Sequence, residues 1–408
     1  MDGIFRAPER SQEMDVFYQS PPELGDQYQQ DPLLRRFLKR KLDPGVFEEM
    51  EPQLQRMGRR AATDLLELSQ RAEAEPPRHI PYDAWGRRID QIATSSAWQA
   101  FKEISAREGL VALAYERRHG WQSRICQFAL LYLFHPSSAF YTCPLAMTDG
   151  AAKAIELYGG EFLKTRAFSR LTSRAPAQFW TSGQWMTERS GGSDVGGTST
   201  IAKSHPGGFK LYGSKWFTSA TTSEMAMTLA RIEGDPLGSS GLSLFSLELR
   251  EEGGGLNHIC VHRLKEKLGT RALPTAELTL DGTRAVLVGG PGDGVKKISS
   301  LLNITRLYNA ICAVASMRRA IALAKSYAAK RVAFGQPLCS HPLHQETLAR
   351  LEVTFRACFH LTFDVVELLG REEAGEAGPE TRALARLLTP IAKLYTAKAA
   401  IQVCSEIL

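Results

Sequence analysis

Apolar residues recur every three to four positions from about residue 32 to residue 174. This period places apolar side chains on one face of a helix. The apolar faces are formed by Leu54, Met57, Ala61, Leu65 and Leu68, and further on by Trp98, Phe101, Ile104 and Leu110. Asp43-Pro44 and Pro76-Pro77 interrupt the pattern, because proline ends or kinks a helix. The pattern predicts a helical N-terminal region.

The period changes to strict alternation between about residue 179 and residue 290. Short runs of this kind are 209–212, 242–247 and 276–280, and glycine-rich turns separate them. Alternation with turn residues between the runs is typical of β-strands that have one buried face. The middle of the chain is therefore predicted to be a β domain.

The helical period returns at Val295. It predicts one long helix, a second helix from His344 to Leu369, and a third that starts near Glu380. No Gly, Asn or Pro closes the third helix before Leu408, so we expect the chain to end inside its last domain. The expected class is α+β multidomain, with a helical domain over 1–178, a β-barrel-like domain over 179–290 and a helical bundle, incomplete, over 291–408.

Composition is ordinary for a soluble globular chain: 43% of the 408 residues are hydrophobic and 23% are charged. Fifty basic and 44 acidic residues leave a net charge of +6. This mild charge is compatible with anionic small ligands or with weak nucleic-acid contact. The densest basic run, Arg35 to Lys41, favours the solvated face of an early helix over a nucleic-acid patch.

Metal sites and disulfides find little support in the pattern. Seven cysteines are scattered with no Cys-x-x-Cys pair, which favours reduced thiols and no zinc site. His258 and His262 stand four apart, as helical metal ligands do, but the alternation of Ile259 and Val261 between them favours a strand with two surface histidines.

The sequence gives no sign of a leader or a membrane span. The first thirty residues lack the apolar core of a signal peptide and contain more acidic residues than a mitochondrial transit peptide should. The most apolar stretch, 128–134, is too short to cross a bilayer. A cytoplasmic protein is expected, with the mitochondrial matrix as the alternative.

Two segments of the middle region carry candidate chemistry. Thr187, Ser190 and Ser193 supply hydroxyls around Gly191 and Gly192. So little side-chain bulk lets backbone N–H groups approach a flat cofactor edge or a phosphate, although a flexible surface turn explains the composition equally well. The second segment is Lys215-Trp216-Phe217-Thr218. Its adjacent aromatics, together with the lysine and the hydroxyl, favour the solvent-facing edge of a binding site over the core.

Four ordered motifs resemble those of the acyl-CoA dehydrogenase family. Met186-Thr187-Glu188 through Gly192-Ser193-Asp194 resembles its first signature, and Lys215 to Thr218 resembles its Trp-Ile-Thr element. Lys267-Leu268-Gly269-Thr270-Arg271 and Arg331-Val332-Ala333-Phe334-Gly335 resemble two later motifs of the family. Arg189 in place of proline, the segment 143–148 and the segment 306–310 resemble the branch of bacterial alkylation-response (AidB-like) flavoproteins and their animal relatives.

The resemblance implies FAD as cofactor and assigns roles to individual residues. Met186, Thr187 and Ser193 would hold the flavin edge and pyrophosphate, while Trp216, Phe217 and Thr218 would flank the ring. Arg331 and Phe334 would reach the FAD of a neighbouring subunit, where a guanidinium pairs well with phosphate. Ser193 and Arg306 would contact the substrate.

The resemblance also points to a missing catalytic base. Most family members place the glutamate that removes the α-proton near the C-terminus, in a region expected beyond Leu408. A minority place it immediately before the arginine that matches Arg306, and here that position is Thr305. Glu188 is expected to orient its loop rather than to abstract a proton.

The implied function is FAD-dependent α,β-dehydrogenation of a fatty acyl-CoA by a homo-oligomer, a homotetramer in this family. Without the usual glutamate, turnover by this chain is doubtful. The alternatives are an inactive fragment or isoform, and an acyl-CoA-binding or DNA-binding flavoprotein, since bacterial members of the branch have been linked to DNA.

Overall fold

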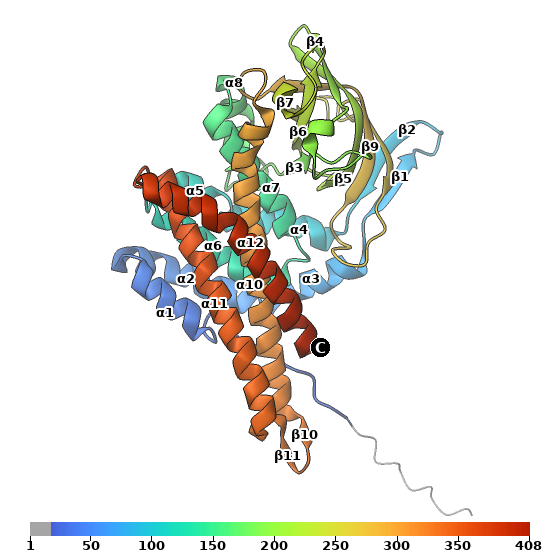
Figure 1. Cartoon of the computed structure of the whole chain (residues 1–408). Helices are drawn as coiled ribbons and strands as arrows, with labels where there is room; N and C mark the ends of the chain where they lie inside the picture. The colour runs from blue at the N-terminus through green and yellow to red at the C-terminus, as the bar shows by residue number, and fades with distance from the viewer. Residues whose placement is uncertain (1–17) are drawn as a thin grey trace, which may run out of the picture.

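The structure is a computed structural model that describes residues 18–408. It has a β-barrel at one end, a long helical bundle that reaches the other end, and a layer of N-terminal helices beside them (Figure 1). The helical, β and helical order predicted from the sequence is confirmed. The acidic residues near the start that bear on the targeting prediction lie mostly outside the described residues.

The N-terminal region is helical where the apolar period predicts it. Its helices are α1 (Pro32–Lys41), α2 (Pro44–Arg60), α3 (Asp64–Ala74), α4 (Ser96–Arg107), α5 (Ala112–Glu116), α6 (Gln122–Phe134), α7 (Thr142–Tyr158), α8 (Glu161–Leu163) and α9 (Ser169–Leu171). Leu54, Met57 and Leu65 are at most 1% exposed, as their spacing requires. On α1 the run Arg35 to Lys41 turns Phe37 and Leu38 inward, while most of its basic side chains face solvent.

One element of this region was not predicted. Residues 78–93 form an antiparallel hairpin of β1 (Arg78–Tyr82) and β2 (Arg88–Ala93), and the expectation of a wholly helical segment is wrong there. Pro76-Pro77 prevents continuation of α3, and Asp83 closes the turn by accepting hydrogen bonds from the backbone N–H of Trp85 and Arg87, both at 2.9 Å. The Trp85-Gly86 turn between two alternating runs was the available signal.

The middle region is a closed barrel with two added strands. Its strands are β3 (Ser182–Trp185), β4 (Ile201–His205), β5 (Gly208–Ser219), β6 (Met225–Ile232), β7 (Leu242–Glu248), β8 (Ile259–Leu264) and β9 (Thr275–Leu287). The ring runs β6–β4–β5–β9–β7 and closes by pairing of β7 with β6, while β3 lies parallel beside β6 and β8 pairs with β9. His262 lies on β8 and His258 directly precedes it, as the alternation predicts.

The C-terminal region consists of three long helices and a small hairpin. They are α10 (Gly294–Lys330), β10 (Val332–Ala333), β11 (Gln336–Pro337), α11 (Pro342–Glu373) and α12 (Pro379–Ile407). By length and composition α10, rather than 128–134, is a candidate membrane span. Half of its most apolar window is buried in the protein, and it packs against α7, α11 and α12 as a core helix of the bundle does.

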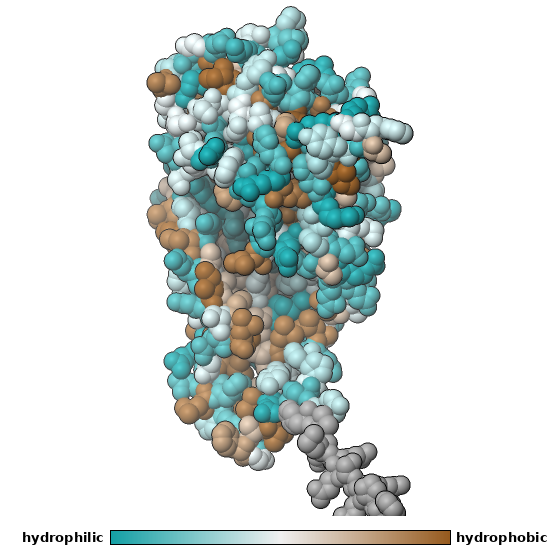
Figure 2. Space-filling model, turned by 90° about the vertical axis from the view of Figure 1, so that its right-hand side faces the viewer, coloured by the Kyte–Doolittle hydropathy of each residue, from teal (hydrophilic) through white to brown (hydrophobic). Residues whose placement is uncertain are grey.

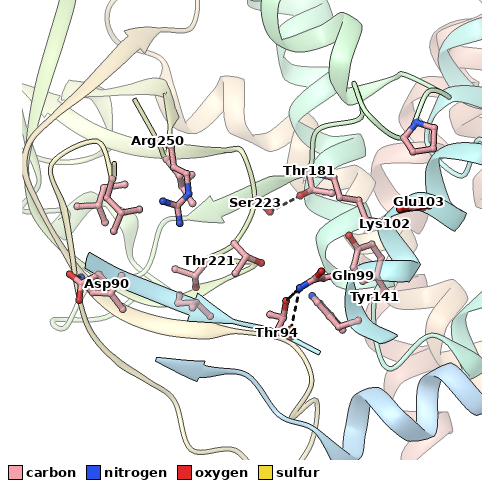
Figure 3. Close-up of a pocket in the computed structure, with 18 of the residues that line it drawn as sticks. Asp90, Thr94, Gln99, Lys102, Glu103, Tyr141, Thr181, Thr221, Ser223 and Arg250 are labelled. Atoms are coloured by element: carbon pink, nitrogen blue, oxygen red, sulfur yellow. Dashed lines mark hydrogen bonds between the residues drawn. The ribbon is translucent and has the colours of Figure 1, made fainter. Parts of the chain in front are cut away.

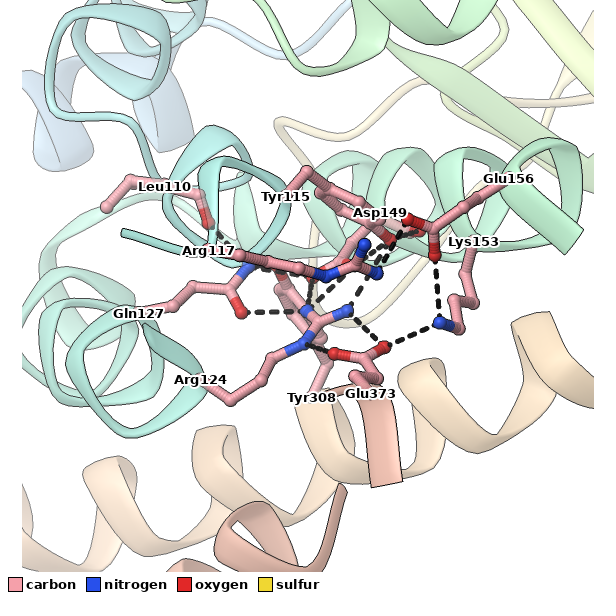
Figure 4. A network of polar contacts seen from close by, with 10 residues as sticks. All are labelled: Leu110, Tyr115, Arg117, Arg124, Gln127, Asp149, Lys153, Glu156, Tyr308 and Glu373. Atoms are coloured by element: carbon pink, nitrogen blue, oxygen red, sulfur yellow. Dashed lines mark hydrogen bonds and ion pairs between the residues drawn. The ribbon is translucent and has the colours of Figure 1, made fainter. Parts of the chain in front are cut away.

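A buried ion network joins the bundle to the N-terminal helices (Figure 4). Arg124 of α6 is 2% exposed and pairs with Asp149 of α7 at 2.8 Å and with Glu373 of α11 at 2.6 Å. Tyr308 of α10 donates to Asp149 at 3.1 Å. Burial alone would raise the pKa of Glu373, but Arg124 lowers it to about 2. The network therefore ties α6, α7 and α11 through ionised groups, and α10 through the neutral Tyr308 hydroxyl.

Candidate functional site

The glycine-rich segment 186–194 forms a tight loop at the carboxyl end of β3. Glu188 and Gly191 exchange two backbone hydrogen bonds of 3.0 and 3.1 Å. Gly191 has φ +142, and a Cβ at Gly192 would lie 2.6 Å from the Thr187 hydroxyl. The two glycines are thus required by backbone conformation and by close approach. This rigid geometry favours a cradle over a flexible turn.

Glu188 anchors this loop to the barrel. Its carboxylate accepts hydrogen bonds from the backbone and hydroxyl groups of Ser199 and Thr200, and from Lys215 Nζ at 2.8 Å. Burial would raise the pKa of Glu188, but Lys215 and the hydroxyls bring it to about 2. Burial lowers the pKa of Lys215, which also donates to the Leu229 carbonyl at 3.1 Å. Glu188 is therefore a structural anion, as expected, and unsuited to be a proton acceptor at neutral pH.

The loop meets the second motif through one backbone hydrogen bond. Trp216 N–H donates to the Thr187 carbonyl at 2.9 Å. The Lys265 ammonium lies 4.1 Å from the centroid of Trp216 and 4.3 Å from that of Phe217, which are cation–π distances. The two motifs, about twenty-five residues apart in the sequence, form one surface. Lys265 was not predicted to belong to it.

The predicted cofactor residues differ in how they face this surface. Met186 and Thr187 are half-buried, and Ser193 is exposed on the loop. Phe217 is 59% exposed with φ +53, inside a bulge of β5 that turns it outward. Thr218 is fully buried and its hydroxyl donates to the Ala276 carbonyl at 2.8 Å. The Thr218 side chain therefore supports the barrel in this structure.

The first turns of α10 lie against the same region. Met186 packs on an apolar cluster that includes Ile298 and Leu301, and Thr305 and Arg306 follow one turn later. The Thr305 hydroxyl donates to the Leu302 carbonyl at 3.0 Å, and Arg306 donates to Asn303 at 2.8 Å. A hydroxyl held in this way is no base at neutral pH.

Arg331 and Phe334 lie far from the loop in the same chain. They belong to the β10–β11 hairpin, which follows the C-terminal end of α10, whereas Gly294 at its other end packs against β7 (Figure 1). A helix of 37 residues is roughly 55 Å long at 1.5 Å per residue. Phe334 is 96% exposed with φ +51 at the tip of this hairpin.

Within the described part of the chain, no group of three or more His, Cys, Asp or Glu side chains could hold a metal ion. The Lys267–Arg271 motif forms the loop between β8 and β9, where Lys267 donates to the Leu273 carbonyl at 2.7 Å. The anchoring role of Lys215 was missed by sequence reasoning, because nothing local to residues 188 and 215 reveals that they pair.

Comparisons with known proteins agree over most of the described chain. Residues 19–175 match the adaptive response protein AidB N-terminal domain, residues 183–283 the acyl-CoA dehydrogenase middle domain, and residues 292–408 the acyl-CoA dehydrogenase C-terminal domain. The fold and the joined motifs are those of the acyl-CoA dehydrogenase class of proteins. The chain belongs to the acyl-CoA dehydrogenase family.

Particular relatives place it in the AidB-like branch. The chain is 46% identical over 400 residues to acyl-CoA dehydrogenase family member 11 of Caenorhabditis elegans, covering 96% of this chain and 65% of that protein. It is 31% identical over 342 residues to putative acyl-CoA dehydrogenase AidB of Escherichia coli K12, covering 82% of this chain and 61% of that protein. The chain thus spans less than two thirds of the length of both curated relatives.

Two solved structures resemble it closely. One is titled Bd2924 apo-form, with a TM-score of 0.95 and 56% identity, covering 96% of this chain and 79% of that one. The other is C. elegans ACDH-11 in complex with C11-CoA, with a TM-score of 0.94 and 44% identity, covering 98% of this chain and 69% of that one.

Proposed function

We propose that this protein is an FAD-dependent oxidoreductase that introduces an α,β double bond into a fatty acyl-CoA. The observation that carries the proposal is the hydrogen bond from Trp216 to Thr187, which joins the two flavin motifs into one surface. The C11-CoA bound to the C. elegans relative supports an acyl-CoA as substrate. Family membership supports FAD, which these enzymes typically use.

The residues on this surface fit a flavin. Nothing lies within 4 Å of a Cβ at Gly191, so the loop backbone is open to a ligand there. Thr187 and exposed Ser193 offer hydroxyls, and half-buried Trp216 offers an aromatic edge. The Lys265 ammonium lies beside the rings and pairs with Glu277, and with Arg263 on the same carboxylate this group keeps one net positive charge, which suits an electron-rich cofactor edge and phosphate groups. Met186, Thr187, Ser193, Trp216 and Phe217 would hold the cofactor.

Bound FAD would supply the acceptor for the hydride that leaves the β-carbon. The chain's own residues orient the site. The Glu188–Lys215 pair fixes the loop without exchanging protons at neutral pH, and Arg306 at the edge of α10 offers a guanidinium to an anionic substrate. The α-proton needs a carboxylate within hydrogen-bond reach, a role that neither Thr305 nor Glu188 fills.

We further infer that the protein works as a homo-oligomer. The β10–β11 hairpin carries Arg331 and exposed Phe334 to the end of the molecule opposite the barrel (Figure 1). Contact of these residues with a flavin therefore requires the loop of another subunit.

The experiment is spectroscopic. The purified full chain is expected to be yellow, with flavin absorbance bands. Anaerobic addition of an acyl-CoA that carries an eleven-carbon acyl chain is expected to bleach these bands when a carboxylate is in place to remove the α-proton. A colourless protein that takes up no added FAD would contradict the flavin site. If the protein is yellow and binds this acyl-CoA but is not bleached, even in the Thr305→Glu variant, the proposed dehydrogenation is contradicted and the flavin site is not.

A further inference from the structure

A cleft of about 710 Å³ lies between α4, the β1–β2 hairpin and the barrel (Figure 3). This volume is within the usual range of small-molecule sites. One wall is apolar and is built by Ile92 of the hairpin with Leu256, Ile259 and Val261 of the barrel region. The opposite wall, on the α4 side, carries Tyr141 and the cationic Lys102, whereas Arg250 lies on the barrel side beside Leu256 (Figure 3).

The cleft opens mainly at the end of β3 away from the predicted flavin surface, and only Trp185 of its lining adjoins Met186. Thr181 and Ser223 line it, and they stand at the amino ends of the parallel strands β3 and β6. The 186–194 loop leaves the carboxyl end of β3. The four residues of this strand place its two ends roughly 10 Å apart.

Tyr141 supplies a hydroxyl that is open to the cleft and has no hydrogen-bond partner among the described residues. It is 4% exposed and lines the cleft, and its ring packs on Trp98 with centroids 4.8 Å apart. Within residues 18–408 its hydroxyl makes no hydrogen bond, whereas the neighbouring Thr181 hydroxyl bonds Ser223 at 3.0 Å. Burial raises the pKa of Tyr141, so this hydroxyl stays protonated and can donate.

The charges at the cleft favour an anion. Arg107 and Arg250 lie on its rim, and no carboxylate of the described residues is within ion-pair distance of Arg250, which donates only to the Gly254 carbonyl at 2.8 Å. Asp90, also in the lining, is already held by Arg88 at 2.8 Å and by His79 at 2.9 Å. Glu103 is the other lining carboxylate. The donors that remain are Tyr141 and the arginines.

We propose that this cleft is a second ligand site, which binds a small organic anion with its apolar body against the barrel wall, its carboxylate or phosphate at Arg250, and the Tyr141 hydroxyl facing it from the α4 side. The site adds to the proposed oxidoreductase function and does not depend on it. The β1–β2 hairpin, which the helical period did not predict, lines the cleft between α4 and the barrel.

The test uses the full chain as purified and three probes that share a phenyl ring: phenylacetate, phenyl phosphate and neutral 2-phenylethanol. Calorimetry is expected to detect binding of at least one anion and weaker binding of the alcohol. Tyr141→Phe keeps the ring packing and removes the hydroxyl donor, so it should lower the affinity for the anion about five- to tenfold. Arg250→Gln, on an exposed side chain, should weaken the anion by about tenfold and leave the alcohol unchanged.

The matched control is Arg386→Gln, an exposed arginine of α12, which should change nothing. Preference for phenylacetate or for phenyl phosphate identifies the anionic group, and either preference supports the site. The proposal is overturned if neither anion binds below about 10 mM (about 3 kcal/mol of affinity). It is equally overturned if both binding-site variants bind like wild type, or if the alcohol binds as tightly as the anions.

Discussion

At the residue scale, the pair of Glu188 and Lys215 decides the shape of the flavin surface. Lys215 is fully buried and Glu188 is 4% exposed. Such pairs add little net stability, but removing one partner leaves the other charge buried and uncompensated. The main effect of the pair is therefore to hold the 186–194 loop in one conformation.

Glu188→Gln should destabilise the protein by about 3–5 kcal/mol, because Lys215 loses its counter-ion. Lys215→Met combined with Glu188→Gln should recover part of this loss. Chemical denaturation of the two single variants and the double variant measures the coupling. Additive effects of the two substitutions would contradict a functional pair.

A second prediction at this scale concerns Thr305. Its hydroxyl serves the Leu302 carbonyl, and a threonine does not take a proton at neutral pH. Thr305→Glu should therefore raise the rate of anaerobic flavin reduction by an acyl-CoA in this chain at least about tenfold. Thr305→Gln, of the same size without the charge, is the control. Equal rates in all three proteins would exclude position 305 as a workable base position.

At the element scale, α7 and α10 approach each other closely and support the cluster on which the flavin surface packs. A Cβ at Gly150 would lie 2.5 Å from Leu301 Cγ and 3.1 Å from the Leu301 carbonyl oxygen. The two helices can touch there only because position 150 has no side chain. Leu301 belongs to the cluster on which Met186 packs, so this contact reaches the candidate site.

Gly150→Ala should destabilise the protein by about 1–3 kcal/mol through overpacking, despite the better helix propensity of alanine. Gly45→Ala in α2 is the matched control, since nothing lies within 4 Å of a Cβ there. Thermal unfolding followed by circular dichroism compares the two. A Gly150→Ala protein as stable as the control would show that α7 and α10 can separate freely.

At the scale of the whole molecule, apolar side chains gather over the lower, helical part of the face in Figure 2. Large exposed apolar residues also recur along one helix at helical spacing: Leu384, Leu387, Ile391, Leu394 and Tyr395 of α12. Faces of this kind mark contact surfaces, which agrees with the proposed assembly.

Phe334→Ala tests that assembly. The side chain is 96% exposed, so its loss should change the stability of the separate subunit by no more than about 0.5 kcal/mol. It should nevertheless lower flavin content and shift sedimentation to smaller species, if subunits meet at the β10–β11 hairpin. Trp85→Ala, 93% exposed on the other hairpin, is the control. Unchanged flavin content in Phe334→Ala would argue against a flavin contact between subunits.

Acid should unfold the protein over a defined range. The pKa values of Glu188 and Glu373 are lowered to about 2 from an ordinary 4.5. Their contribution is complete above about pH 4.5 and is lost as the pH falls toward 2, on the order of 3 kcal/mol for each group. Denaturation at pH 7, 4.5 and 3 measures this. The acid loss should shrink in Glu373→Gln, and an identical loss in that variant would contradict the assignment.

The period of apolar residues was enough to predict most elements of this fold. Leu54 and Met57 are buried and residues 209–212 lie in a strand because helices and strands obey local geometry. The β1–β2 hairpin escaped prediction, since its two strands are short and stand between long helical runs. The motifs predicted Thr187 and Trp216 as neighbours, but not the inward-facing hydroxyl of Thr218, which depends on a bulge in β5.

The sequence by itself determined the helical, β and helical order, the four motifs and hence the family, because these depend on periodicity and residue type over short distances. Only the tertiary structure decided that Lys215 neutralises Glu188, that Gly150 admits Leu301, and that Tyr141 faces a cleft beside the hairpin. These contacts join residues far apart in the chain, and their geometry follows from how helices and sheet pack rather than from any local pattern. The same packing places Arg331 and Phe334 at the opposite end of the molecule from the loop that their motif would serve.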